Sequence, residues 1–145
     1  MRPELLIQRL DDGLPLPQYA KPGDAGIDLY SRVDTTVAPG ERQLVPSGIA
    51  IALPQGFVAL SVPRSGFALK QGGTLLNSPG VIDAGYRGEV GSIVYNSGST
   101  DLVIARGDRI AQLLIFELPA VTITEVASLP GTQRASGGFG STGKA

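Results

Sequence analysis

Hydrophobic and polar residues alternate along most of this chain with a period of two. In residues 57–62, for example, the larger aliphatic side chains occupy every second position. Residues 110–118 differ, because almost all of them are apolar. Alternation is typical of half-buried strands, and a short unbroken apolar run indicates a strand with both faces buried. The segments that fit a strand are 49–53, 57–62, 90–95, 102–104, 110–118 and 121–124.

Glycine and proline separate these segments. Of 145 residues, 20 are glycine and 11 are proline, and they are spread along the chain. Each costs roughly 1 to 3 kcal/mol in a helix interior, so long helices are excluded. Only one short helical turn is expected, at residues 67–70. Short strands between such turns predict one all-β domain, a sandwich or a barrel.

The C-terminal segment has a different composition. Residues 131–145 contain one aromatic residue, Phe139, and no aliphatic residue larger than alanine. Such a segment cannot bury itself, so we expect a flexible arm. The chain is thus predicted to divide into a domain of residues 1–130 and an arm of residues 131–145.

Charge and composition narrow the chemistry. The formal net charge is −1, which argues against a protein that coats nucleic acid. Neither a membrane-spanning apolar run nor a signal-peptide pattern is visible, so the expected location is cytoplasmic. Histidine and cysteine are absent, which excludes imidazole bases, thiol nucleophiles and zinc thiolate sites. Any metal must be bound by oxygen, as Mg²⁺ is, and any general base must be a carboxylate, a tyrosine or a lysine.

Two segments carry groups that suit phosphate. Arg64, Ser65 and Gly66 directly follow a predicted strand, and a guanidinium, a hydroxyl and a glycine N–H all donate hydrogen bonds to anions. The arm offers Arg134, several hydroxyls and glycines, and an aromatic ring, Phe139, that could stack on a base. For residues 64–66 the alternative is an ordinary turn with a solvated arginine. For the arm the alternative is a disordered terminus.

Residues 77–88 combine a carboxylate and an aromatic ring. In an extended chain Asp83 and Tyr86 would face opposite sides, but Ala84 and Gly85 between them permit a tight turn. Such a turn would bring both side chains to one cavity. Asp83 is then a candidate base for activating water, and a carboxylate that caps the turn is the alternative.

Asp28 and Gln112 are polar residues in apolar surroundings. Asp28 lies between Ile27 and Leu29, and a buried carboxylate is costly unless it is paired or lies near a metal. Gln112 interrupts the apolar run at 110–118, and a buried amide needs hydrogen-bond partners. A cross-strand bond and a ligand contact are both open for Gln112. Residues 106–109 are expected to form a turn with a surface ion pair.

The order of five segments is more specific than any one of them. In this order, and over nearly the whole length, the chain resembles the trimeric dUTPases (deoxyuridine triphosphate nucleotidohydrolases). The segments are Ala25–Leu29, Pro63–Gly66, Asn77–Gly88, Gly107–Gln112 and Arg134–Gly143.

The resemblance implies a fold, an activity and an assembly. The fold would be an all-β, β-clip or jelly-roll-like distorted barrel with a flexible C-terminal arm. The activity would be Mg²⁺-dependent hydrolysis of dUTP to dUMP and pyrophosphate, which keeps uracil out of DNA and supplies dUMP for thymidylate synthesis. The assembly would be a homotrimer with shared active sites, and neither nucleic acid nor membrane would be a partner.

The resemblance also implies residue roles. Asp83 would orient the attacking water, and Gln112 would lie near the phosphates and that water. Asp28 would contact Mg²⁺ through coordinated water, and Tyr86 would pack on the deoxyribose and obstruct a 2′-hydroxyl. The other substrate-binding residues would be Arg64, Ser65 and Gly66 for phosphate, Asn77, Gly80, Val81 and Ile82 for uracil, and, from another subunit, Arg134 for phosphate, Phe139 over the uracil, and Gly140, Ser141 and Thr142 over the phosphates.

Two alternatives remain at this point. The related dCTP deaminases use a glutamate on the strand that follows the third motif, where this chain has Ile93. Isoleucine cannot transfer protons, and Glu89 would need a different strand register, so deamination is disfavoured. The other alternative is a trimer that binds nucleotide without hydrolysing it.

Overall fold

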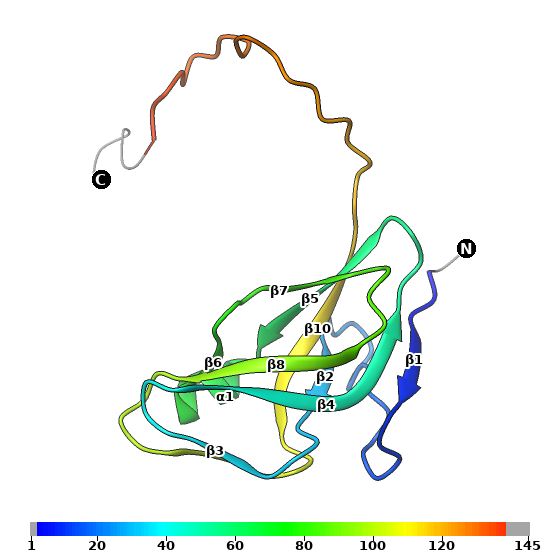
Figure 1. Ribbon diagram of the computed structural model, residues 1–145, viewed down its shortest axis with the longest axis vertical. Helices are drawn as coiled ribbons and strands as arrows, with labels where there is room; N and C mark the ends of the chain where they lie inside the picture. The colour runs from blue at the N-terminus through cyan, green and yellow to red at the C-terminus, as the bar shows by residue number, and fades with distance from the viewer. Residues whose placement is uncertain (1–2, 139–145) are drawn as a thin grey trace.

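The computed structural model describes residues 3–138, which form a mostly β, jelly-roll-like fold (Figure 1). Its one helix within that range is α1 (Ser65–Gln71). The strands are β1 (Leu6–Arg9), β2 (Ile27–Tyr30), β3 (Thr35–Val37), β4 (Arg42–Ala52), β5 (Phe57–Pro63), β6 (Gly73–Leu75), β7 (Gly80–Asp83), β8 (Glu89–Asn96), β9 (Leu102–Ile104) and β10 (Arg109–Glu117).

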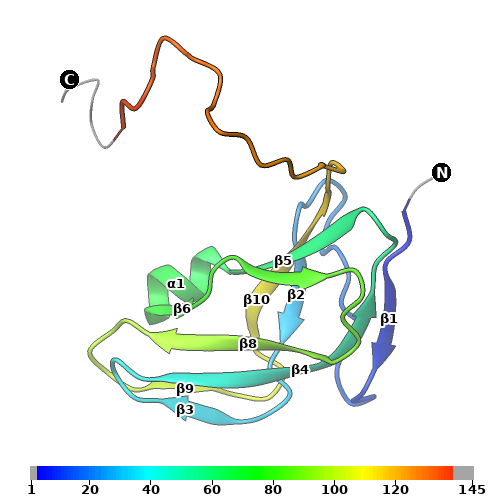
Figure 2. The same ribbon diagram turned by 45° about the horizontal axis from the view of Figure 1, so that its top comes forward.

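The strands pair in three antiparallel sheets. One sheet has the order β1-β4-β8-β6, the second has β2-β10-β5-β7, and β3 pairs with β9. Strands distant in the sequence therefore become neighbours, as Figure 2 shows for β4 and β8. Strand β5 lies between β10 and β7, and its register with β7 places Val58, near the start of β5, opposite Asp83 at the end of β7.

The core lies between the two larger sheets. Leu29 of β2, Val45 of β4, Val94 of β8 and Leu113 of β10 are completely buried there. Burial of each such aliphatic side chain contributes about 1.5 to 3 kcal/mol. Every second residue of β8 is buried, from Val90 to Asn96, which is the period that the sequence predicts.

Most of the expected elements are confirmed, whereas one expected strand is absent and another is buried over only part of its length. The strands at 49–53, 57–62, 90–95, 102–104 and 110–117 form, and α1 includes the predicted helical turn. Residues 121–124 do not form a strand, because they lie away from the sheets and pair with none of the described strands, and Ile123 is 95% exposed. In β10 the burial does not extend to its end, where Phe116 is exposed.

The described residues after β10 leave the body of the fold. Residues 118–138 contain neither strand nor helix, and Figures 1 and 2 show them extending away from the sheets. The predicted boundary at residue 130 stays a prediction. In the described range the longest helix is the two-turn α1, so no helix there has the length and apolarity of a membrane span.

Candidate active site

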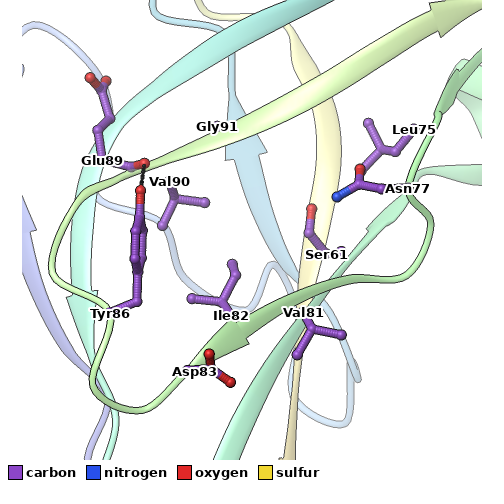
Figure 3. Close-up of a pocket in the computed structure, with 11 residues that line it drawn as sticks. Ser61, Leu75, Asn77, Val81, Ile82, Asp83, Tyr86, Glu89, Val90 and Gly91 are labelled. Carbon is purple, nitrogen blue, oxygen red and sulfur yellow. Dashed lines mark hydrogen bonds between the residues drawn. The ribbon is translucent and has the colours of Figure 1, made fainter.

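A pocket opens between β7, the end of β5 and the start of β8 (Figure 3). It has a volume of about 620 Å³ including its open mouth. Strand β7 supplies one wall with both backbone and side chains, because β7 pairs with β5 along one edge only within its sheet. The lining residues are Ser61, Leu75, Asn77, Gly80, Val81, Ile82, Asp83, Tyr86, Glu89, Val90 and Gly91.

A tight turn brings Asp83 and Tyr86 to this pocket. The Tyr86 N–H donates to the Asp83 carbonyl at 3.0 Å, which closes a four-residue turn. Arg87 fastens the turn by donating to the Ala84 carbonyl at 2.6 Å and the Tyr86 carbonyl at 2.9 Å. The turn expected from the sequence therefore forms, and both side chains line one cavity.

The Tyr86 ring is held at its hydroxyl and lies beside Gly88. Its hydroxyl donates to the Glu89 carbonyl at 3.1 Å. Gly88 leaves room for the ring, because a Cβ there would lie 2.6 Å from Tyr86 Cζ. The Glu89 carboxylate points away from the pocket in Figure 3 and accepts hydrogen bonds from Arg32 at 3.2 Å and from the Gly48 N–H at 2.8 Å. Asp83 is therefore the carboxylate that remains available to the pocket.

The opposite end of the pocket is formed by Asn77, Gly80 and Ser61. In Figure 3 Asn77 and Ser61 lie on the side away from Tyr86 and Asp83. Gly80 pairs with Ser61 across β5 and β7. A Cβ on Gly80 would lie 3.1 Å from Asn77 Nδ2, so only glycine leaves the amide in its place without adjustment.

A second pocket lies at the start of α1, and Asp28 connects its arginines. Asp28 is 15% exposed, and its carboxylate pairs with Arg64 Nε at 2.9 Å and with Arg109 Nη1 at 3.4 Å. Two guanidinium groups around one carboxylate leave positive charge facing the pocket. The lining residues are Ala20, Lys21, Asp24, Ala25, Gly26, Asp28, Arg64, Ser65, Gly66, Arg109 and Gln112.

Gln112 joins strand β10 to the end of β5. Its Nε2 donates to the Pro63 carbonyl at 3.3 Å, and its side chain is half-buried. A Cβ on Gly26 would lie 2.9 Å from Gln112 Cδ, so the absence of a side chain at Gly26 leaves space for the Gln112 amide. Gln112 thus makes the cross-strand bond and also lines the second pocket, and the two alternatives left open by the sequence are compatible.

The predicted site residues fall into three places. Asn77, Gly80, Val81, Ile82, Asp83 and Tyr86 line the first pocket, whereas Arg64, Ser65, Gly66, Gln112 and Asp28 line the second. These two pockets have no lining residue in common. Arg134 lies in neither, and its Nε donates to the Gly137 carbonyl at 2.8 Å. Phe139, Gly140, Ser141 and Thr142 lie outside the described residues.

Three residues at or beside these pockets have contacts that the sequence does not predict. The sequence predicts Arg109 in a surface turn, whereas the structure makes it the first residue of β10, directly before the buried Ile110. Gly88 carries no sequence signal for its contact with Tyr86. Ser61 could have been noticed as a polar residue on the strand face that it shares with Ala59.

A network of charges joins the loops after β1 and β2 to the loop before β10. Arg106 donates to both oxygens of Asp11, and Arg32 lies 3.5 Å from the same carboxylate. The hydrogen bonds from Arg106 first, and then the Gly13 N–H and the nearby positive charges, hold the pKa of Asp11 well below its usual value of 3.8. Across residues 3–138 no three acidic side chains converge into a metal-binding cluster.

Comparison with known proteins shows that this chain is similar to one family of enzymes. The sequence model of the dUTPase family matches residues 12–143. The deoxyuridine 5'-triphosphate nucleotidohydrolase of Streptomyces coelicolor is 52% identical over 97% of this chain and 77% of its own length. The enzyme of that name from Mycolicibacterium gilvum is 51% identical over 99% of this chain and 97% of its own length.

Comparison with solved structures shows that the fold, too, is that of a dUTPase. A structure of the dUTPase of Staphylococcus bacteriophage 80alpha, a G164S mutant with dUpNHpp, superimposes with a TM-score of 0.89. It is 25% identical and covers 97% of this chain and 99% of its own. The chain therefore belongs to the dUTPase family.

Proposed function

We infer that this chain is a dUTP diphosphatase, which hydrolyses dUTP to dUMP and pyrophosphate. The observation that carries the assignment of residues is the pocket where Asp83 and Tyr86 meet, with the backbone of Gly80–Ile82 as its wall. Family membership and relatives at about half identity support the activity itself.

The first pocket is proposed to bind the deoxyuridine. The backbone of β7 would pair with the uracil edge, in the way that one strand pairs with another, and Asn77 would complete the recognition. Tyr86, held by Glu89 and Gly88, would pack on the deoxyribose and leave no space for a 2′-hydroxyl. This orientation puts the sugar near Asp83 and the base toward Asn77.

The second pocket is proposed to bind the triphosphate. Arg64, Ser65 and Gly66 would hold its oxygens, and Gln112 would lie beside them. Arg64 is already oriented by Asp28, and such an oriented guanidinium loses little side-chain freedom when phosphate binds. We add Arg109 to this group, because it shares the Asp28 carboxylate with Arg64.

Mg²⁺ is proposed as the metal of this site. Asp28 fits contact through water, because each of its oxygens is already paired with an arginine and retains a lone pair for a water donor. Mg²⁺ keeps several waters and is usually held by substrate phosphates. When bound, it would neutralise charge on the triphosphate.

Asp83 is proposed as the base. Its carboxylate would accept a proton from a water, whose oxygen forms a bond to the α-phosphorus while the bond from that phosphorus to the bridging oxygen breaks. Pyrophosphate is then the leaving group, and Arg64 would stabilise the negative charge on the phosphate chain.

The two pockets are proposed to meet across subunits of a homotrimer. Within one chain they share no lining residue, which supports a site assembled from different copies. The described part of the C-terminal segment also carries exposed apolar side chains, including Val121 and Ile123, that a neighbouring subunit would cover. Arg134, Phe139, Gly140, Ser141 and Thr142 would close over the nucleotide of a neighbour. We further propose a cytoplasmic location, where deoxynucleotides are consumed.

The test is pyrophosphate release from dUTP, dCTP, dTTP and UTP in the presence of Mg²⁺. Rapid turnover of dUTP alone is expected, and equal turnover of all four would contradict the assignment. Asp83→Asn should lower kcat by at least about 100-fold, which is the usual contribution of a positioned base, while binding of dUpNHpp is retained. An unchanged kcat would remove Asp83 from its role.

A further inference from the structure

Ser61 is a buried hydroxyl without a hydrogen-bond partner. It is 4% exposed, and its Oγ has no partner among the described residues. Buried side-chain hydroxyls nearly always have one, because an unpaired hydroxyl has lost its water without compensation. The unpaired Ser61 hydroxyl is therefore expected to lower the stability of the free protein unless a ligand or water supplies its partner.

A second serine hydroxyl is also buried and unpaired in the described part of the chain, but it lies outside the first pocket. Ser92 is 1% exposed, and its Oγ is also unpaired among residues 3–138. Ser92 does not line the first pocket, whereas Ser61 does. The two serines therefore match in burial and in the missing hydrogen bond, and differ in access to the pocket.

The place of Ser61 in the pocket determines what it would meet. It lies opposite Gly80 in the β5–β7 pair, and in Figure 3 its hydroxyl points toward the space between Asn77 and β8. Tyr86 and Asp83 lie at the other end of the same pocket. If the sugar lies at the Tyr86 end, the edge of the base farthest from its glycosidic nitrogen reaches Ser61. In uracil that edge carries the C4 carbonyl oxygen.

We propose that Ser61 is a base-recognition residue, whose hydroxyl donates a hydrogen bond to the C4 carbonyl oxygen of the uracil, directly or through one water. The inference rests on the placement of deoxyuridine in this pocket. It explains why a polar side chain occupies a strand face that it shares with Ala59: the partner arrives with the substrate. A hydroxyl kept unpaired for a ligand lowers the stability of the free protein and raises its affinity for that ligand.

The inference is tested with Ser61→Ala and with Ser92→Ala as its matched control. Ser61→Ala should raise KM for dUTP about 10-fold, which corresponds to one hydrogen bond of about 1.4 kcal/mol. The melting temperature without nucleotide should stay the same or rise, since an unpaired hydroxyl is removed. Ser92→Ala should leave KM unchanged. Equal KM values for Ser61→Ala and the unaltered protein would overturn the inference.

A change in the substrate tests the same hydrogen bond by altering its acceptor. In 4-thio-dUTP the C4 oxygen is replaced by sulfur, a weaker acceptor, so the unaltered protein should prefer dUTP. In Ser61→Ala this preference should largely disappear, because the donor is gone. If the preference is the same in both proteins, Ser61 acts only through packing and the inference fails.

Asn77→Ala separates this inference from the proposed function. Asn77 lines the same end of the pocket, so its loss should weaken dUTP binding in either case. If Asn77→Ala is impaired and Ser61→Ala is not, only the role of Ser61 is wrong. If both variants bind dUTP normally, the base does not lie in this pocket, and the residue assignment fails with it.

Discussion

At the scale of single residues, the first pocket is shaped by glycines. Because they have no side chain, they leave room for the side chains of proposed site residues. Gly80 admits the Asn77 amide, and Gly88 admits the Tyr86 ring. None of these backbone positions needs a left-handed conformation, so the requirement is for space. The sequence shows the glycines, but it does not show which side chain each one makes room for.

The contact between Gly88 and Tyr86 leads to a prediction about the sugar. A Cβ in Gly88→Ala would overlap the ring and push it out of position, so discrimination between dUTP and UTP should fall on the order of 10-fold in kcat/KM. Gly85→Ala is the matched control in the same turn, because an added Cβ there meets nothing within 4 Å and should retain the discrimination. If Gly88→Ala discriminates as well as Gly85→Ala does, Tyr86 does not exclude the 2′-hydroxyl.

At the scale of elements, one charge network ties together the ends of several strands. Asp11 follows β1, Arg32 follows β2 and Arg106 precedes β10. Arg32 also reaches Glu89 at the start of β8, whose carbonyl accepts from the Tyr86 hydroxyl. The network therefore supports the strand ends behind the Tyr86 turn, although none of its carboxylates is a proposed catalytic group.

This network predicts a dependence of stability on pH. The pKa of Asp11 is lowered on folding, so its stabilising effect is present above its usual value of 3.8 and is lost as the pH falls below that value toward its folded pKa. Asp11→Asn should lower Tm at pH 7, and the difference from the unaltered protein should shrink between pH 4 and pH 3.

The control for this prediction is Asp12→Asn. Asp12 is 90% exposed and lies 3.8 Å from Arg9, so its replacement should change Tm little at any pH. Thermal melts followed by circular dichroism give the comparison. A Tm difference for Asp11→Asn that stays constant from pH 7 to pH 3 would show that the ion pair does not account for the stabilisation.

At the scale of the whole molecule, local patterns predicted most of the fold and part of the site. Alternation gives strands such as β8 because burial on one face is a local property of the sequence. The short turn at Asp83–Tyr86 was predictable for the same reason. The pairing of Asp28 with Arg64 and Arg109 was not, because it joins residues on three segments through the sheet order.

The segment 121–124 shows the limit of such reasoning most clearly. Its alternation satisfies the rule for a strand, yet the segment leads away from the sheets and pairs with none of the described strands. Its exposed Val121 and Ile123 are expected to find their contacts on a neighbouring subunit. The separate positions of the two pockets agree with the proposal that each site forms between chains.

Mixed trimers test this central claim most directly. Asp83→Asn alters the first pocket and Arg64→Gln alters the second, and each variant alone should be nearly inactive. If sites form between chains, random mixing in equal amounts pairs an intact Asp83 with an intact Arg64 in roughly a quarter of the sites. Co-refolding Asp83→Asn with Asn77→Ala is the control, because both changes lie in one pocket of one chain and cannot complement each other.

The measurement is pyrophosphate release from dUTP by the co-refolded mixture. The predicted result is recovery of about a quarter of the activity for Asp83→Asn with Arg64→Gln and no recovery for the control mixture. Activity that remains at the sum of the two separate variants would mean that one chain supplies both Asp83 and Arg64 to the same site, and it would contradict the shared-site account.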